Sequence, residues 1–132
     1  MKPTANRKTL DQMGATILIC QALRAWTNAR AHQANAQQAI FAVVHEGGRG
    51  FLAPVLDGLF SCLSDAKGTP LQCGDGCTMT NDEYHLCTAV LGNGTPSAAW
   101  LGGSISAVAR AALTSSHAIL RTELSSRTES AA

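Results

Sequence analysis

The sequence predicts an all-α fold, a compact bundle of five or six helices with a Gly/Cys-rich loop. Hydrophobic residues make up 45% of the 132 residues but aromatic residues only 5%, so the core consists mainly of Leu, Ile, Val and Ala, which suits closely packed helices. A chain of this length forms one domain that buries about two thirds of its unfolded surface. We expect the helical domain at residues 10–124, between a basic flexible tail at 1–9 and a flexible Ser/Thr-rich tail at 125–132.

Two helices are expected in the first third of the chain. The first begins near Leu10 and ends near Arg30, and its apolar residues cover a broad arc at helical spacing, which indicates a central helix. The apolar pattern resumes at Ala36, so a second helix follows and ends at residues 45–46. Gly47 is suited to the left-handed cap of this helix.

A third helix is predicted to begin at Pro54, because proline fits the first turn of a helix and disfavours a helical residue before it. The helix ends at Lys67. Its core-facing residues are Val55, Leu56, Leu59 and Leu63. The segment 68–78 contains three glycines and Pro70, and we expect it to be a loop.

Thr80 and Glu83 form the pattern of a capping box, in which the hydroxyl and the carboxylate satisfy two free N–H groups at the start of a helix. A fourth helix is therefore expected at residues 81–91. The glycines of the segment 92–94 end this helix.

The C-terminal part is expected to contain a short helical turn and one long helix. Thr95 and Pro96 provide an N-cap and a first helical residue for the turn. Gly102 and Gly103 separate it from the long helix, whose apolar residues recur at helical spacing from Ile105 to Leu124.

Cysteines cluster between residues 73 and 87, which suggests a zinc or iron site. Cys73, Cys77, His85 and Cys87 supply sulfur and imidazole ligands that zinc accepts. His85 and Cys87, however, are about 200° apart around a helix axis, so both cannot face one ion. Cys62 can replace the histidine, and the predicted metal set is Cys62, Cys73, Cys77 and Cys87. Its spacings match no common zinc ribbon or iron–sulfur pattern.

Two other interpretations of the cysteines stay open, and neither needs a cofactor. Cys62 and Cys87 can be small buried hydrophobic residues on helix faces, with Cys20 in the core as well. Cys73 and Cys77 are flanked by glycines, so we expect them to be exposed on a flexible loop where they can form a reversible disulfide. No basic residue lies close to them in sequence that would lower the pKa of a thiol.

The segment Cys77-Thr78-Met79-Thr80-Asn81-Asp82-Glu83 precedes a predicted short helix, and Gly50-Phe51 leads to Pro54 before another. This order resembles a family of small uncharacterised helical bacterial proteins that carry a Cys just upstream of a Met-Thr-x-Asp-Glu motif. The resemblance covers residues 15–115 in the order of elements and implies a helical fold, but no activity. The spacing of Cys73 and Cys77 differs from the adjacent cysteines of that family.

Charge and hydropathy exclude several classes of partner. Ten basic and nine acidic residues give a formal net charge of +1, which offers no electrostatic reason for binding nucleic acid or an anionic membrane. The apolar run at residues 17–20 is far shorter than a membrane span requires. Five cysteines without a secretory signal indicate a reducing compartment, so we expect a soluble cytoplasmic protein.

No motif of a catalytic nucleophile is present in the sequence, and we do not expect an enzyme. Small residues at 98–99 and 104–112 would let another helix approach closely. We therefore expect a noncatalytic interaction module with a protein partner, or a self-associating module that forms a homodimer. The alternative function is a metal-binding or thiol-redox protein that uses the cysteine segment 73–87.

Overall fold

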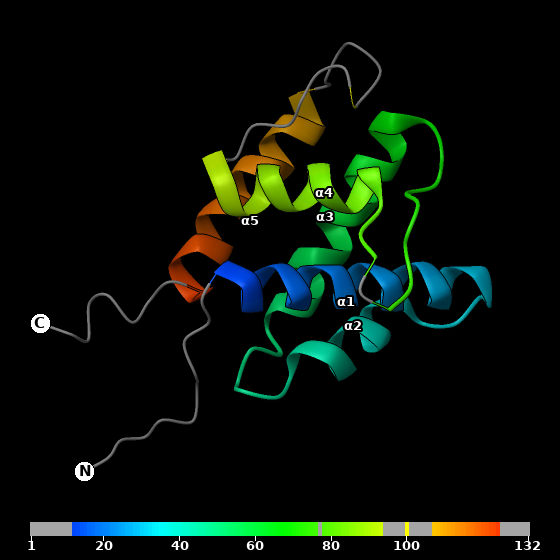
Figure 1. The fold of residues 1–132 in the computed structure, drawn as a ribbon, viewed down its shortest axis with the longest axis horizontal. Helices are drawn as coiled ribbons and strands as arrows, with labels where there is room; N and C mark the ends of the chain where they lie inside the picture. Colours follow the sequence, from blue (N-terminus) through cyan, green and yellow to red (C-terminus); the bar gives the residue numbers. More distant parts are fainter. Residues whose placement is uncertain (1–11, 77, 94–99, 101–106, 125–132) are drawn as a thin grey trace, which may run out of the picture.

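The computed structural model describes residues 12–76, 78–93, 100 and 107–124. Within this part of the chain the fold is all-α and compact, which confirms the predicted fold class (Figure 1). The elements are α1 (Gln12–Ala31), α2 (Ala36–Val44), α3 (Leu52–Lys67), α4 (Asn81–Thr88), the π-helical segment η1 (Ala89–Asn93) and α5 (Ala107–Leu124). The predicted tails, the predicted turn after Pro96 and the glycines at 102–103 lie outside the described residues.

The helices pack around one core. α1 packs on α2, α2 on α3, and α3 on α5, while α4 lies alongside α1 and η1 packs on α5 (Figure 1). The largest fully buried side chains are mostly leucine and isoleucine, as the composition predicts: Ile19, Leu23, Ile40, Leu52, Leu56, Leu59, Phe60, Leu63, Leu86, Leu113 and Leu120. Trp26 meets Phe60 edge to face, with ring centroids 5.7 Å apart. Burying each large apolar side chain stabilises the fold by about 1.5–3 kcal/mol.

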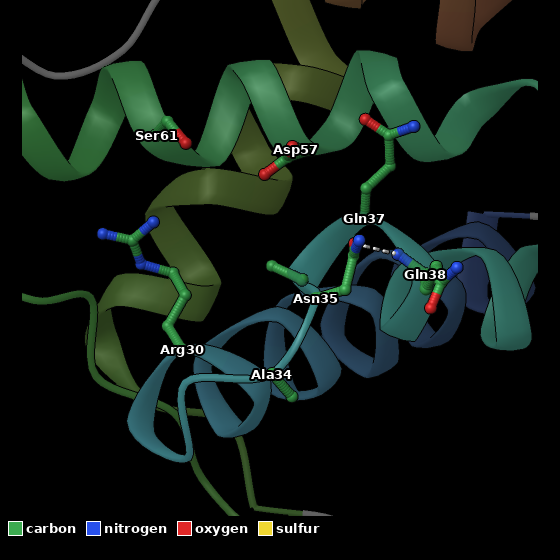
Figure 2. A pocket seen from close by; sticks show the side chains of 8 residues that line it. Arg30, Ala34, Asn35, Gln37, Gln38, Asp57 and Ser61 are labelled. Carbon is green, nitrogen blue, oxygen red and sulfur yellow. Dashed lines mark hydrogen bonds between the residues drawn. The ribbon is translucent and has the colours of Figure 1, made fainter.

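The second helix is capped at both ends by local contacts. The Asn35 side chain accepts a hydrogen bond from the backbone N–H of Gln38 at 3.0 Å, which satisfies a free donor at the start of α2 (Figure 2). α2 ends at Val44 instead of residues 45–46, and its C-cap is His45, whose N–H donates to the carbonyl of Phe41, instead of Gly47. Gly47 lies in the α2–α3 turn (residues 45–51) and has the predicted left-handed conformation, with φ +81°. Gly50 lies under the ring of Phe41, where a Cβ atom would come within 2.4 Å of Cε1.

The start of α3 differs from the prediction. The helix begins at Leu52 instead of Pro54, because the N–H groups of Leu52 and Ala53 donate to the carbonyls of Arg49 and Gly50 and form a first turn before the proline. Pro54 then occupies the third helical position, where its missing N–H still costs no intrahelical bond. At the other end, α3 ends at Lys67 as predicted, and Gly68 caps it in the left-handed conformation, with φ +81°.

The start of α4 confirms the predicted capping box of Thr80 and Glu83. The predicted single helix at 81–91 is an α-helix to Thr88 and a π-helix from Ala89 to Asn93. His117 of α5 donates from Nδ1 to the carbonyl of Val90 at 2.7 Å, so the carbonyl of the π-helical segment is bonded to α5. No helix among the described residues has the length and apolar character that a bilayer crossing needs.

Candidate functional site

A polar centre joins α1 to the α3–α4 loop (residues 68–80, residue 77 being outside the described part). Glu83 is fully buried, and its carboxylate accepts from Arg24 Nε at 2.7 Å and from Arg24 Nη2 at 3.1 Å. The same guanidinium donates to the backbone carbonyls of Gly76 and Thr78, each at 2.9 Å. We call Arg24, Glu83, Gly76 and Thr78 the Arg24 network. One side chain of α1 therefore holds the loop at two carbonyls and pairs with a carboxylate of α4.

The position of Glu83 follows from the start of α4. The Thr80 hydroxyl accepts from the N–H of Glu83 at 3.1 Å, and Glu83 Oε1 accepts from the N–H of Thr80 at 3.0 Å. Thr80 also donates its hydroxyl hydrogen to the carbonyl of Gln72 at 2.7 Å, which folds the loop back on the helix. Gly74 lies so close that a Cβ atom there would come within 2.3 Å of the Thr78 carbonyl oxygen. Only glycine permits this approach.

The hydrogen bonds that Glu83 accepts determine the protonation state of its carboxyl group. Burial by itself would raise the pKa of Glu83, but the hydrogen bond from Arg24 and the backbone N–H groups of Thr80 and Gly74 outweigh it and hold the pKa below its ordinary value. The hydrogen bond to Glu83 raises the pKa of Arg24 in turn. Glu83 is thus an ionised acceptor at neutral pH. The Arg24 network positions the loop and offers no proton to a substrate.

A second carboxylate at the start of α4 binds the loop from another side. Asp82 is buried, and its Oδ2 accepts from the backbone N–H of Gln72 at 2.7 Å. Its Oδ1 accepts from the indole N–H of Trp100 at 2.7 Å, and Lys67 Nζ lies 3.7 Å from Oδ2. Both acidic residues of the first turn of α4 therefore accept hydrogen bonds from the loop. Their negative charges also interact favourably with the positive end of the helix dipole.

The expected exposure of Cys73 on a flexible loop is wrong. Cys73 is half-buried, and its sulfur lies 3.3 Å from the hydroxyl oxygen of Thr27 on α1. Burial raises the pKa of the Cys73 thiol, although Arg24 opposes that shift from a position that the sequence does not reveal. The glycines allow the loop to fold, but the contacts with α1 fix it. Cys77 lies outside the described residues.

Two other cysteines meet in the core. Cys20 of α1 is buried as predicted, Cys87 of α4 is buried as one of its two open interpretations held, and their sulfur atoms lie 3.7 Å apart. Burial raises the pKa of both thiols, and the proximity of Cys20 raises that of Cys87 further. Both are therefore neutral thiols near pH 7. The sequence allows both residues to be buried but does not predict that they are neighbours.

The predicted metal set of Cys62, Cys73, Cys77 and Cys87 stays a prediction. Cys62 is half-buried on α3, and Cys62, Cys73 and Cys87 are free thiols. Among the residues that the structure describes, no three His, Cys, Asp or Glu side chains come together in a way that could hold a metal ion. The fourth member of the set, Cys77, lies outside that part.

An open apolar groove runs along the outer face of α1, and we call it the α1 groove. Its volume is about 880 Å³. The lining residues are Met13, Thr16, Ile17, Cys20, Gln21, Arg24, Gly76 and Met79. Met13 is 71% exposed, Ile17 49% and Met79 40%. The groove therefore combines adaptable apolar side chains with the buried thiol of Cys20 at its floor.

A second, polar pocket of about 600 Å³ lies where α1, α2 and α3 meet. Figure 2 shows Arg30 and Asn35 on one side and Asp57 and Ser61 of α3 opposite them. Asp57 accepts from the indole N–H of Trp26 at 2.9 Å, and the Arg30 guanidinium lies 4.7 Å from the centre of the same ring. Both charged side chains of this pocket thus contact Trp26, which accounts for their placement without a ligand.

Sequence reasoning missed Arg24 and the neighbouring thiols of Cys20 and Cys87. A signal for Arg24 exists, because it is the single charged residue of α1 before its last turn. A comparison of the chain with protein-family models, with curated proteins and with solved structures finds no match in any of the three. The resemblance to the small helical bacterial proteins therefore stays a prediction.

Proposed function

We propose that the protein is a noncatalytic self-associating module, and that a second copy of the chain docks in the α1 groove. The observation that carries this proposal is the exposure of Met13, Ile17 and Met79 side by side around one groove. Contiguous exposed apolar surface is costly in water and marks interaction sites. Methionine side chains adapt to a partner surface, which suits such a contact.

The charge of the groove favours a second copy over a charged partner. Among the described residues that line the groove, Arg24 is the one charged residue, and Glu83 neutralises it at 2.7 Å. In a twofold dimer the same patch faces itself, so a patch with a net charge would repel its own copy. The described lining of the α1 groove has no such net charge, so two copies of it can meet without burying two like charges.

The pattern along α1 also suits a helix pair. Met13, Ile17 and Arg24 lie on one stripe of α1, at spacings of four and seven residues, and Cys20 lies between them. Two such stripes pack against each other when the helices cross, because the side chains of one helix enter the spaces of the other. The opposite face of α1 packs in the core through Ile19, Leu23 and Trp26.

Native mass spectrometry and light scattering over a concentration series test this proposal. We expect a dimer in the wild type, and we expect Ile17→Asp to weaken it by roughly a hundredfold or more, because the two carboxylates would face each other in the contact. Val108→Asp is the matched control: Val108 is 69% exposed on α5 and away from the groove, so its dimer should match the wild type. Circular dichroism checks that both variants keep their helices.

Two results would overturn the proposal. A wild type that stays monomeric at high micromolar concentration would exclude a second copy as the occupant of the groove. A dimer that Ile17→Asp leaves intact and Val108→Asp disrupts would place the contact on α5 instead.

A further inference from the structure

We propose that Cys20 and Cys87 form a binding site for one copper(I) ion, with a thioether sulfur from the α1 groove as a further ligand. The two thiols come from different helices, α1 and α4, and their sulfur atoms already lie 3.7 Å apart. This site differs from the predicted set of Cys62, Cys73, Cys77 and Cys87, and it does not depend on self-association.

The ligand chemistry selects a soft ion of low coordination number. Thiolate and thioether sulfur favour copper(I), whereas zinc in structural sites needs four ligands in a tetrahedron. In the described part of the chain no group of three His, Cys, Asp or Glu side chains could hold a metal, so Cys20 and Cys87 stand as a pair. A pair of thiols matches an ion that accepts two or three ligands.

The distance between the sulfurs leaves one side of the ion open. Two metal–sulfur bonds of about 2.3 Å that span 3.7 Å enclose an angle of roughly 110°. The open side can therefore take a third ligand. Cys20 lines the α1 groove together with Met13 and Met79, and we infer that one of these two thioethers turns towards Cys20 to complete the site. In the monomer, the same groove gives the ion a path from solvent to Cys20.

Binding exchanges protons for the metal. One copper(I) ion and two neutral thiols give a complex with two sulfur–copper bonds, and two protons leave to solvent, so the site gains one negative charge and no electron is transferred. Arg24 acts on Cys20 with a charge that favours the thiolate, and Glu83 acts with the opposite sign. The burial that keeps both thiols protonated protects them from oxidants and alkylating agents, but a thiophilic ion can displace the protons.

The test is an anaerobic titration of the reduced protein with copper(I), in competition with the chelator bicinchoninate. We expect one copper per chain, and a native mass that rises by one copper less one hydrogen, because copper(I) carries a single positive charge and takes the place of one proton in an ion of given charge. Cys20→Ser and Cys87→Ser should each weaken binding by more than roughly a hundredfold, because loss of a ligand costs more than loss of a supporting group. Cys62→Ser is the matched control and should bind as the wild type does.

A measurement on the wild type covers the case in which a core variant fails to fold. X-ray absorption of the copper-loaded protein should show sulfur ligands alone, and Met79→Leu or Met13→Leu should remove the thioether. Copper that the chelator takes completely, a ligand shell that contains nitrogen or oxygen, or wild-type affinity in both serine variants would overturn the site. Loss of copper in Cys77→Ser with retention in Cys20→Ser would assign the metal to the α3–α4 loop instead.

Discussion

Two glycine-rich connections of this protein are ordered by different means. In the α2–α3 turn, Gly47 and Gly48 adopt the left-handed conformation, and Gly50 fits under the ring of Phe41, a residue of the preceding helix. In the α3–α4 loop, Arg24 binds backbone carbonyls that lie 52 and 54 positions further along the chain. The turn is held by its immediate neighbours, and the loop by another helix.

This difference shows what glycine content does and does not say about a loop. Glycine permits left-handed backbone and close approach, so both segments can fold tightly. Whether such a segment is ordered depends on the partners that it finds. The loop is held by a buried ion pair that has the hydrogen bonds such a pair needs, and by Leu71, which packs into the common core.

Removing the guanidinium of Arg24 should give the largest effect. Arg24→Met leaves the buried carboxylate of Glu83 without its cation, which costs about 3–5 kcal/mol when one partner of a buried pair is removed. We expect the lower end of this range, since the Arg24 side chain is 25% exposed. Urea unfolding followed by circular dichroism measures the loss.

The matched control for this variant is Arg30→Met. Arg30 belongs to the same helix and lies over Trp26, a contact worth about 0.5–1 kcal/mol at an exposed site. Replacing Glu83 as well, in Arg24→Met/Glu83→Gln, should recover part of the loss because no buried charge remains. Equal losses for Arg24→Met and Arg30→Met would contradict the assigned role of the Arg24 network.

The fold followed from local signals in the sequence. Apolar residues at helical spacing and glycine or proline at the boundaries indicate the helices, because both act within a few residues. The capping box joins Thr80 to Glu83 over three positions and is confirmed in full. The predicted start of α3 was wrong by two residues. The preference of proline for the first turn of a helix does not show that Leu52 and Ala53 already form a turn before Pro54.

The candidate site followed from the sequence only in part. Cys20 is buried as predicted, and Cys87 is buried as one of its open interpretations held, but 67 positions separate them, and periodicity does not say which faces of two helices meet. Arg24 and Glu83 are 59 positions apart, and their pairing could not be predicted for the same reason. The expected exposure of Cys73 failed because it used the adjacent glycines and could not include Thr27 and Arg24 of α1.

Acid should weaken the α3–α4 loop more than the α2–α3 turn. The pKa of Glu83 in the folded state lies below its ordinary value of 4.5, so its ionisation stabilises the fold above pH 4.5, and this stability is lost as the pH falls through the lowered pKa. One such group changes the free energy of unfolding by at most about 1.4 kcal/mol per pH unit. Urea unfolding at a series of pH values between pH 6 and pH 3 measures how steeply the free energy of unfolding depends on pH.

Glu83→Gln is the comparison for the acid experiment. It removes the titrating carboxyl, so the free energy of unfolding should fall less steeply below pH 4.5 than in the wild type. Identical slopes for the two proteins would show that other carboxyl groups carry the acid sensitivity.

The smallest expected difference between the two connections is in the free energy of unfolding that one glycine-to-alanine substitution costs in each of them. Gly74→Ala brings a Cβ atom to 2.3 Å from the Thr78 carbonyl, which Arg24 holds in place, and Gly50→Ala brings one to 2.4 Å from the Phe41 ring. Gly74→Ala should cost about 1–3 kcal/mol by overpacking against backbone, and Gly50→Ala less, because the half-exposed Phe41 ring can turn away. In an Arg24→Met background the cost of Gly74→Ala, measured by urea unfolding, should fall by roughly 1 kcal/mol, and that of Gly50→Ala should not change.

Gly58→Ala is the control for these substitutions. Gly58 is exposed in α3, and nothing lies within 4 Å of the position that a Cβ atom would take there, so alanine should stabilise the helix by about 0.5–1 kcal/mol. Costs of Gly74→Ala that are the same with and without Arg24 would show that the loop keeps its shape without the guanidinium.

The hydrogen bonds from Arg24 also affect the resistance of the folded chain to proteolysis. Exposed loops of small and polar residues are the usual places where a protease cuts a folded protein. Asp75 and Gly76 are exposed in such a loop, yet the carbonyls of Gly76 and Thr78 are bonded to the guanidinium. A protease must bind this backbone in an extended form, so cleavage requires that the Arg24 bonds open first. The lifetime of the chain at this loop is therefore set by one arginine on a distant helix.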